Sequence, residues 1–390
     1  MAISRRIQRF MESASWIRRM FEQGAELKRE HGVENVYDFS LGNPDLEPPE
    51  AFFEALEKIA ATRGGGWHRY MQNAGFPATR ARIAARISAE HGVDPGEGGI
   101  VMTVGAAGAL NVTFKSLLDP GNEVLVPSPF FPEYRFYADN HGGRLVLVPT
   151  QADFSLDLDA FAEALNSEVR AVVVNSPNNP TGRVYPQADL DALGALMAEK
   201  SPDATLISDE PYRKIAYDDV EQGSVLRATP CSAVATSFSK DLGLAGERIG
   251  FVAVHPDHPQ RAGFLAAAVF ANRTLGFVNA PAFMQRVIAE LDDTTTVDLA
   301  EYAARRRVFL DGLRAAGYEC VTPEGAFYLF PKAPIEDDVA FIKALLEERI
   351  LSVPGTGFGA PGYFRLSYAV PIESIKAALP GFARVRARFA

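Results

Sequence analysis

The sequence predicts an α/β fold: a mainly parallel sheet covered by helices on both faces, followed by a smaller α+β domain. Between residues 98 and 255, short apolar runs rich in Val and Ile alternate with stretches of helical character. Most of these runs are too short for helices, and such alternation is typical of a parallel sheet. The predicted strands are Ile100–Val104, Glu123–Val126, Leu145–Val148, Ala171–Val174, Thr205–Ile207, Ala233–Thr236 and Ile249–Val254.

The predicted helices follow the same order along the chain. Those expected between the strands include Ala107–Leu118, Leu156–Leu165 and Gln187–Glu199. In the last third the pattern changes to longer helices and two strand-like runs, at Ala280–Leu291, Thr295–Ala316, Ala326–Phe330 and Tyr363–Ala369. This mixture indicates a separate α+β domain.

The domain organisation is predicted from these shifts in pattern. The first fifty residues have no core of their own. We therefore predict an N-terminal arm with part of the small domain at 1–50, a large ligand-binding domain at 51–285 and a small C-terminal domain at 286–390. The first 21 residues carry five arginines, which leaves a transit peptide as an alternative. The helical spacing of Ile3, Ile7 and Phe10 instead favours an amphipathic arm packed on a protein surface.

Composition narrows the class of protein. The 390 residues include 39 Lys and Arg against 49 Asp and Glu, a net charge of −10. This acidic balance argues against nucleic-acid binding. No apolar run approaches the roughly eighteen residues of a membrane-spanning helix, so no membrane association is expected. With only two cysteines, Cys231 and Cys320, no disulfide framework is expected and a cytoplasmic location is predicted.

Residues suited to chemistry follow the predicted strands, where ligands bind in open α/β sheets. After the strand at 233–236, Ser237 and Lys240 lie close to Arg248 in sequence. Hydroxyls and a guanidinium beside one amine suggest a phosphate pocket next to a lysine that forms a Schiff base. The stretch from Ser237 to Lys240 also matches the S-x-x-K motif of serine β-lactamases, but the K-T-G motif that these enzymes need is absent.

Three further clusters also stand at strand ends. Asp209 and Tyr212 follow the strand at 205–207, and a rigid Asn-Pro-Thr-Gly loop that contains Asn179 follows the strand at 171–174. The strand at 100–104 leads through small residues, including Ala106 and Ala107, into a helix, whose free N–H groups make a natural anion site. The G-x-G-x-x-G pattern of dinucleotide-binding proteins is missing there.

The order of these clusters resembles the class I/II aminotransferases, which are pyridoxal-5′-phosphate (PLP) enzymes of fold type I. The resemblance extends from the Ser-Leu-Gly-Asn-Pro motif at 40–44 to the Phe-Arg-Leu-Ser motif at 364–367. It implies a large domain with a mostly parallel seven-stranded sheet and a smaller α+β domain. It also implies PLP as the cofactor, and no metal is expected.

The resemblance assigns cofactor roles to particular residues. Lys240 is implied to bind PLP covalently and to move a proton between substrate and cofactor. Asp209 is implied to pair with the pyridine nitrogen, so that the ring can accept electrons. Tyr212 and Asn179 are implied to hydrogen-bond the phenolic oxygen. Phosphate and ring contacts are implied for Ala106, Ala107, Ser237, Arg248 and Phe131, the last by stacking.

Substrate and subunit contacts are implied in the same way. Arg365 is implied to bind the substrate α-carboxylate as a bidentate pair, with Gly42 and Asn179 beside it. Tyr70 matches a tyrosine that reaches the phosphate of the neighbouring subunit, which implies a homodimer with shared active sites. Arg273 lies near the position of a cross-subunit arginine that reads dicarboxylates, with a one-residue shift.

The sequence departs from the family pattern at several positions. Gly105 and Ala107 stand where Ser or Thr is common, and Glu247 replaces a frequent Trp. Gly108 stands where some aspartate-specific members have Lys. A lysine that would bind the second carboxylate of the substrate is therefore missing at this position.

The predicted function is transfer of the amino group of an L-amino acid to a 2-oxo acid, with 2-oxoglutarate the expected acceptor, by a ping-pong mechanism. The first alternative is a PLP-dependent lyase or decarboxylase that acts on an amino acid. The second is the effector domain of a transcription regulator, which the acidic charge and the lack of room for a DNA-binding segment disfavour.

Overall fold

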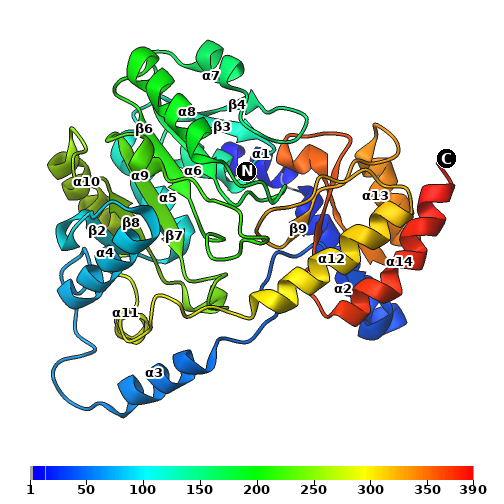
Figure 1. Cartoon of the computed structure of the whole chain (residues 1–390), viewed down its shortest axis with the longest axis horizontal. Coiled ribbons are helices and arrows are strands. Elements are labelled where there is room, and N and C mark those ends of the chain that lie inside the picture. Colours follow the sequence, from blue (N-terminus) through cyan, green and yellow to red (C-terminus); the bar gives the residue numbers. More distant parts are fainter. Residues whose placement is uncertain (1–2, 14, 390) are drawn as a thin grey trace.

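A computed structural model describes residues 3–13 and 15–389 of the chain. Its centre is a seven-stranded sheet with the strand order β2-β8-β7-β6-β5-β3-β4 (Figure 1). Neighbouring strands are parallel except around β8, which is antiparallel to both β2 and β7. The strands are β2 (Ile100–Thr103), β3 (Glu123–Ser128), β4 (Arg144–Pro149), β5 (Val169–Asn175), β6 (Thr205–Asp209), β7 (Ser232–Ser237) and β8 (Gly250–Val254). Each corresponds to a predicted strand, so the predicted fold class is confirmed.

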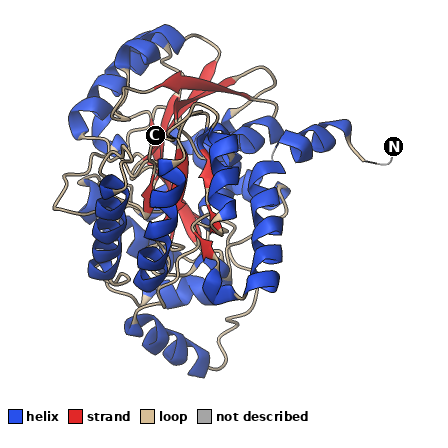
Figure 2. Cartoon of the chain, turned by 90° about the vertical axis from the view of Figure 1, so that its right-hand side faces the viewer, coloured by secondary structure: helices blue, strands red, loops and turns tan. Residues whose placement is uncertain are grey.

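Both faces of the sheet are buried under helices (Figure 2). In β5, Val172 and Val174 belong to one apolar cluster, and Ala171 and Val173 belong to another on the opposite face. The first face packs against α4 (Pro77–His91), α7 (Leu158–Ala164), α8 (Gln187–Lys200) and α9 (Val225–Ala228). The second packs against α5 (Gly105–Leu117), α6 (Glu133–Asn140) and α10 (Arg261–Thr274). Because successive strand residues point to opposite faces, a strand buried on both sides is continuously apolar.

The last third of the chain forms a smaller α+β unit on the right of Figure 1. Its helices are α12 (Leu299–Ala315), α13 (Asp338–Glu347) and α14 (Ile372–Ala387). They pack around a phenylalanine-rich core with three antiparallel strands, β9 (Tyr328–Leu329), β11 (Val353–Pro354) and β12 (Phe364–Ser367). The strand-like run predicted at 363–369 is therefore present, but shorter.

The N-terminal segment joins this smaller unit. β1 (Tyr37–Asp38) pairs in parallel with β10 (Ile350–Leu351), and Phe39 is buried in the same core. Before β1, the chain forms α1 (Arg5–Ser13) and α2 (Ser15–His31). Phe10 packs edge-on against Phe136 of α6 at 5.0 Å between ring centroids. Residues 1, 2 and 14, and the side chains of 12–22, lie outside the described part of the predicted arm.

Two further helices contribute to the core of the large unit. α3 (Glu50–Ala61) and α11 (Ala282–Ala289) pack against each other, and α11 also packs against α4. Ile288 and Leu291 belong to the apolar core of the large sheet. The domain division at residues 50 and 285 stays a prediction.

Candidate active site

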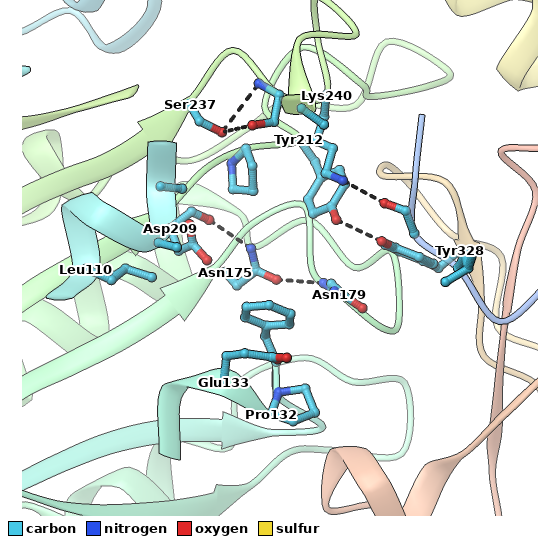
Figure 3. Close-up of a pocket in the computed structure, with 18 of the residues that line it drawn as sticks. Leu110, Pro132, Glu133, Asn175, Asn179, Asp209, Tyr212, Ser237, Lys240 and Tyr328 are labelled. Carbon is cyan, nitrogen blue, oxygen red and sulfur yellow. Dashed lines mark hydrogen bonds between the residues drawn. The ribbon is translucent and has the colours of Figure 1, made fainter. Parts of the chain in front are cut away.

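A cavity of about 340 Å³ lies where the carboxyl ends of the parallel strands meet the smaller unit (Figure 3). Asn175, Asp209 and Ser237 are the last residues of β5, β6 and β7, and all three line the cavity. Asn175 and Asp209 are register partners on neighbouring strands. Tyr328 and Arg365 enter the same cavity from β9 and β12. The sheet and the smaller unit therefore build the site together, as expected for strand ends in an open α/β sheet.

Lys240 lies at one edge of the cavity, just beyond β7. Its Nζ donates a hydrogen bond to the main-chain oxygen of Gly42 at 2.6 Å. Burial, together with the charges of Arg365 and Arg248, lowers the pKa of Lys240 from 10.5 to about 8. A substantial fraction of the amine is therefore neutral near physiological pH, and only the neutral amine can attack a carbonyl carbon.

Asp209 is fully enclosed at the floor of the cavity. The Tyr134 hydroxyl donates a hydrogen bond to its Oδ2 at 2.5 Å, whereas buried Oδ1 has no partner among the described residues. Burial raises the pKa of Asp209 to about 7; the Tyr134 bond opposes that rise and the nearby Glu210 charge adds to it. A buried carboxylate with one free oxygen is stabilised when a cationic N–H group binds to that oxygen.

Tyr212 and Asn179 lie between these two groups and the smaller unit. The Tyr212 hydroxyl shares a hydrogen bond with the Tyr328 hydroxyl at 2.9 Å. Asn175 Oδ1 accepts a hydrogen bond from the Asn179 backbone N–H at 2.6 Å, which fixes the loop after β5. Both predicted residues line the cavity, so the structure brings them to Lys240 and Asp209.

Arg365 is held rigidly on the side of the cavity formed by the smaller unit. Nη1 donates to Asn179 Oδ1 at 3.0 Å and Nη2 donates to the main-chain oxygen of Ser40 at 2.7 Å. The guanidinium lies over the rings of Tyr328 and Phe358, at 4.6 and 4.8 Å from their centroids. Its Nε is buried and makes no hydrogen bond within the described chain. Such a guanidinium can bind a planar carboxylate through two parallel bonds.

A cradle for an anion is built at the beginning of α5. Ala106 and Ala107 line the cavity in the first turn of this helix, together with Ser237 and Arg248. The approach of Arg248 depends on Gly105, because a Cβ at that position would lie 2.8 Å from Nη2 of the arginine. Gly105 also has a φ of +77°, which disfavours other residues. Backbone N–H groups, a hydroxyl and a guanidinium at a helix N-terminus suit a phosphate group.

Two of the predicted residues lie outside this cavity. The Tyr70 side chain is 90% exposed. Arg273 is exposed on α10, where its guanidinium lies 5.2 Å from the centre of the Phe270 ring. Neither residue lines the cavity of its own chain. Gly42 and Phe131 do line it.

The structure also adds residues that were not singled out from the sequence. Glu133 and Tyr137 of α6 and Tyr328 of β9 line the cavity, and Tyr134 reaches Asp209 from α6. A signal was available for the α6 residues, because Glu133 and Tyr134 follow Phe131 closely in the sequence. Tyr328 had no such signal, since its contact with Tyr212 depends on how the smaller unit packs.

Comparison of the sequence with known proteins identifies its family. A family model described as aminotransferase class I and II matches residues 34–381. The chain belongs to this family. The aspartate/prephenate aminotransferase of Thermus thermophilus is 35% identical over 395 residues, which is 99% of each chain.

Solved structures agree with the sequence match. The crystal structure of an aminotransferase from Eubacterium rectale has a TM-score of 0.95 at 36% identity, and the match covers 100% of this chain and 99% of that one. The aspartate aminotransferase of Thermus thermophilus with maleate has a TM-score of 0.86 at 32% identity, covering 99% and 100%.

The family match establishes the reaction class. The protein is a transaminase of PLP fold type I, and PLP is its cofactor. A lyase or decarboxylase, the alternative left open by the sequence, is not favoured, because the relatives are aminotransferases. Among the helices that the structure describes, none is both long and apolar enough to cross a bilayer.

Proposed function

We propose that the cavity binds PLP between Asp209 and the cradle at the beginning of α5, with Lys240 as the covalent attachment point. The observation that carries this proposal is the buried Oδ1 of Asp209, which has no hydrogen-bond partner in the described chain and fits a protonated pyridine nitrogen. The phosphate is assigned to Ala106, Ala107, Ser237 and Arg248, the ring face to Phe131, and the phenolic oxygen to Tyr212 and Asn179.

The bound cofactor supplies an electron sink for the electrons released at the substrate Cα. Asp209 holds a proton at the pyridine nitrogen, because its carboxylate gains the partner that Oδ1 lacks. Lys240 Nζ takes and returns the Cα proton, a task suited to an amine with a pKa of about 8.

Arg365 is the residue that we assign to substrate binding. Its stacked guanidinium binds the α-carboxylate, and the Gly42 backbone lies beside it. This grip holds the carboxylate in place and leaves the Cα–H bond to break, which favours transamination over decarboxylation. Aspartate is the donor named for several relatives and is the reference donor for assays. 2-Oxoglutarate and pyruvate are the two acceptors to compare.

We further propose that the enzyme is a cytoplasmic homodimer. The predicted cross-subunit Tyr70 is 90% exposed, as a residue that serves a neighbour must be in the isolated chain. Ile3, Ile7 and Met11 on the N-terminal arm and Phe270 on α10 are large apolar side chains that are also exposed. Burial of such groups against a second copy would remove apolar surface from water.

The proposal is tested by reconstituting the purified chain with PLP and following its visible absorbance during single half-reactions. Addition of an amino donor should convert the cofactor to its amine form, and addition of a 2-oxo acid should reverse the change. Lys240→Ala should abolish both changes, whereas Lys343→Ala, which alters an exposed lysine on α13, should leave them intact. Spectral changes that persist in Lys240→Ala would refute the assignment.

A further inference from the structure

Glu133 is a carboxylate inside the cavity that the proposed catalytic groups do not use. It is the first residue of α6 and lines the cavity beside Pro132. Its Oε2 is buried and has no hydrogen-bond partner among the described residues. Figure 3 shows Glu133 at the lower edge of the pocket and Lys240 at the upper edge, with Asn175 and Asn179 between them.

The charges around the cavity single out Glu133. Five of the described residues that line it are charged: Glu133, Asp209, Lys240, Arg248 and Arg365. The proposed function pairs Asp209 with the pyridine nitrogen, Lys240 with the cofactor carbon, Arg248 with the phosphate and Arg365 with the substrate α-carboxylate. Of these five, Glu133 is the only residue to which the proposed function assigns no contact with cofactor or substrate.

The surroundings of Glu133 favour a cationic partner. Burial raises the pKa of its carboxyl. A hydrogen bond from its own backbone N–H and the charge of Arg365 act in the opposite direction, but the effect of burial is larger. A buried carboxylate is unfavourable until a cation or a donor reaches it. Tyr137, Tyr328 and Phe358 also line the cavity, and aromatic faces accommodate both methylene groups and cations.

A second substrate carboxylate has no matching cation in the described lining of this cavity. The helix position at which some aspartate-specific family members have Lys is Gly108, and Arg273 does not line the cavity of its own chain, so a role for Arg273 in this site requires a second copy of the chain. A distal carboxylate would instead meet Glu133, and two like charges in a buried site repel strongly.

We propose that Glu133 binds the side-chain cation of the amino donor, so that the enzyme prefers L-amino acids with a basic side chain over L-aspartate and L-glutamate. This inference rests on the proposed function, because it needs Arg365 to be occupied by the α-carboxylate. The same charge favours pyruvate over 2-oxoglutarate as the acceptor.

The wild-type test is a donor panel at fixed pyruvate. L-Lysine, L-ornithine and L-arginine are compared with L-norleucine, a neutral analogue of lysine, and with L-aspartate. The kcat/KM for the best basic donor should exceed that for L-norleucine and that for L-aspartate by about 30-fold or more, the scale of a buried charge pair. L-Aspartate at or above the basic donors would overturn the inference.

Glu133→Gln tests the residue itself, because it keeps the shape and removes the charge. The ratio of kcat/KM for L-lysine to that for L-aspartate should fall by about 30-fold or more. L-Norleucine should change little. Glu163→Gln makes the same change at an exposed position on α7 and should leave the ratio as in the wild type. An unchanged ratio in Glu133→Gln would overturn the inference.

Binding measured without turnover provides a second readout. 2-Methyl-L-lysine and 2-methyl-L-aspartate lack the Cα proton and cannot be transaminated, so calorimetry with the PLP-loaded enzyme reports their affinity alone. The lysine analogue should bind the wild type more tightly, and Glu133→Gln should remove that preference. Equal affinities in the wild type would overturn the inference even if the variant fails to fold. Transamination of L-aspartate alone would leave the proposed function standing, whereas no cofactor binding at all would overturn both.

Discussion

The Tyr134 hydroxyl donates a hydrogen bond to Oδ2 of Asp209, and this leaves Oδ1 of the same carboxylate buried and without a partner in the described chain. Tyr134 comes from α6 on one face of the sheet, whereas Asp209 ends β6 in the centre. The bond fixes the orientation of the carboxylate and opposes the rise in its pKa that burial causes. Oδ1 of Asp209 is therefore free to accept a hydrogen bond from one cationic N–H group.

Tyr134→Phe should weaken PLP binding about tenfold or more. The substitution removes a hydrogen bond to a charged group, which contributes about 1.5–3 kcal/mol, and raises the pKa of Asp209 further above its ordinary value. Titration of the apoenzyme with PLP measures the change. Tyr318→Phe removes another buried hydroxyl bond, to the Phe382 main-chain oxygen, and is the matched control. If the wild type, Tyr134→Phe and Tyr318→Phe all bind PLP with equal affinity, the role assigned to Tyr134 is contradicted.

Arg365→Lys should raise KM for the amino donor strongly and leave PLP binding nearly unchanged. Lysine cannot form the bidentate pair or keep the stacking over Tyr328 and Phe358, so a loss of about 2–5 kcal/mol in kcat/KM is expected. Arg306→Lys is the control, because Arg306 is also buried and lies 4.4 Å from the Tyr217 ring centre, outside the cavity. A donor KM that rises equally in both variants would count against the α-carboxylate assignment.

Uptake of PLP by the apoenzyme should speed up with pH, with a midpoint near 8. The pKa of Lys240 falls from 10.5 to about 8, so below this value Nζ is mostly protonated and unreactive, and above it the neutral amine dominates. The initial rate of visible absorbance gain between about pH 6.5 and 9.5 measures this dependence. A rate that rises about tenfold per pH unit across this whole range, without levelling off, would mean that the pKa of Lys240 is not lowered.

Subunit mixing tests whether Tyr70 serves the neighbouring active site. Tyr70→Ala and Lys240→Ala are each expected to be nearly inactive as homodimers. If Tyr70 acts across the interface, a mixed dimer contains one site with both residues intact, and activity should return to about half of the wild-type level per dimer. Absence of recovery after exchange of subunits has been demonstrated would contradict the action of Tyr70 across the interface.

The strands and the groups that follow them could be predicted from the sequence for a physical reason. A strand buried on both faces is a continuous apolar run, and the carboxyl ends of parallel strands share one edge, so the sequence pattern alone places Asp209 and Lys240 together. Glu133 and Tyr328 could not be placed in this way. Closeness to Phe131 in the sequence is the one local signal for Glu133, and Tyr328 has none. Both positions depend on long-range packing, namely on how α6 crosses the sheet and how β9 returns to the cavity.

The central claim is that Lys240 carries the cofactor, and borohydride reduction of the PLP-loaded enzyme tests it most directly. Reduction makes the linkage between lysine and cofactor permanent, so peptide mass spectrometry can locate it. We predict a single pyridoxyl-modified peptide that contains Lys240. Modification of a different lysine, or no modification of a protein that has bound PLP, would contradict this claim.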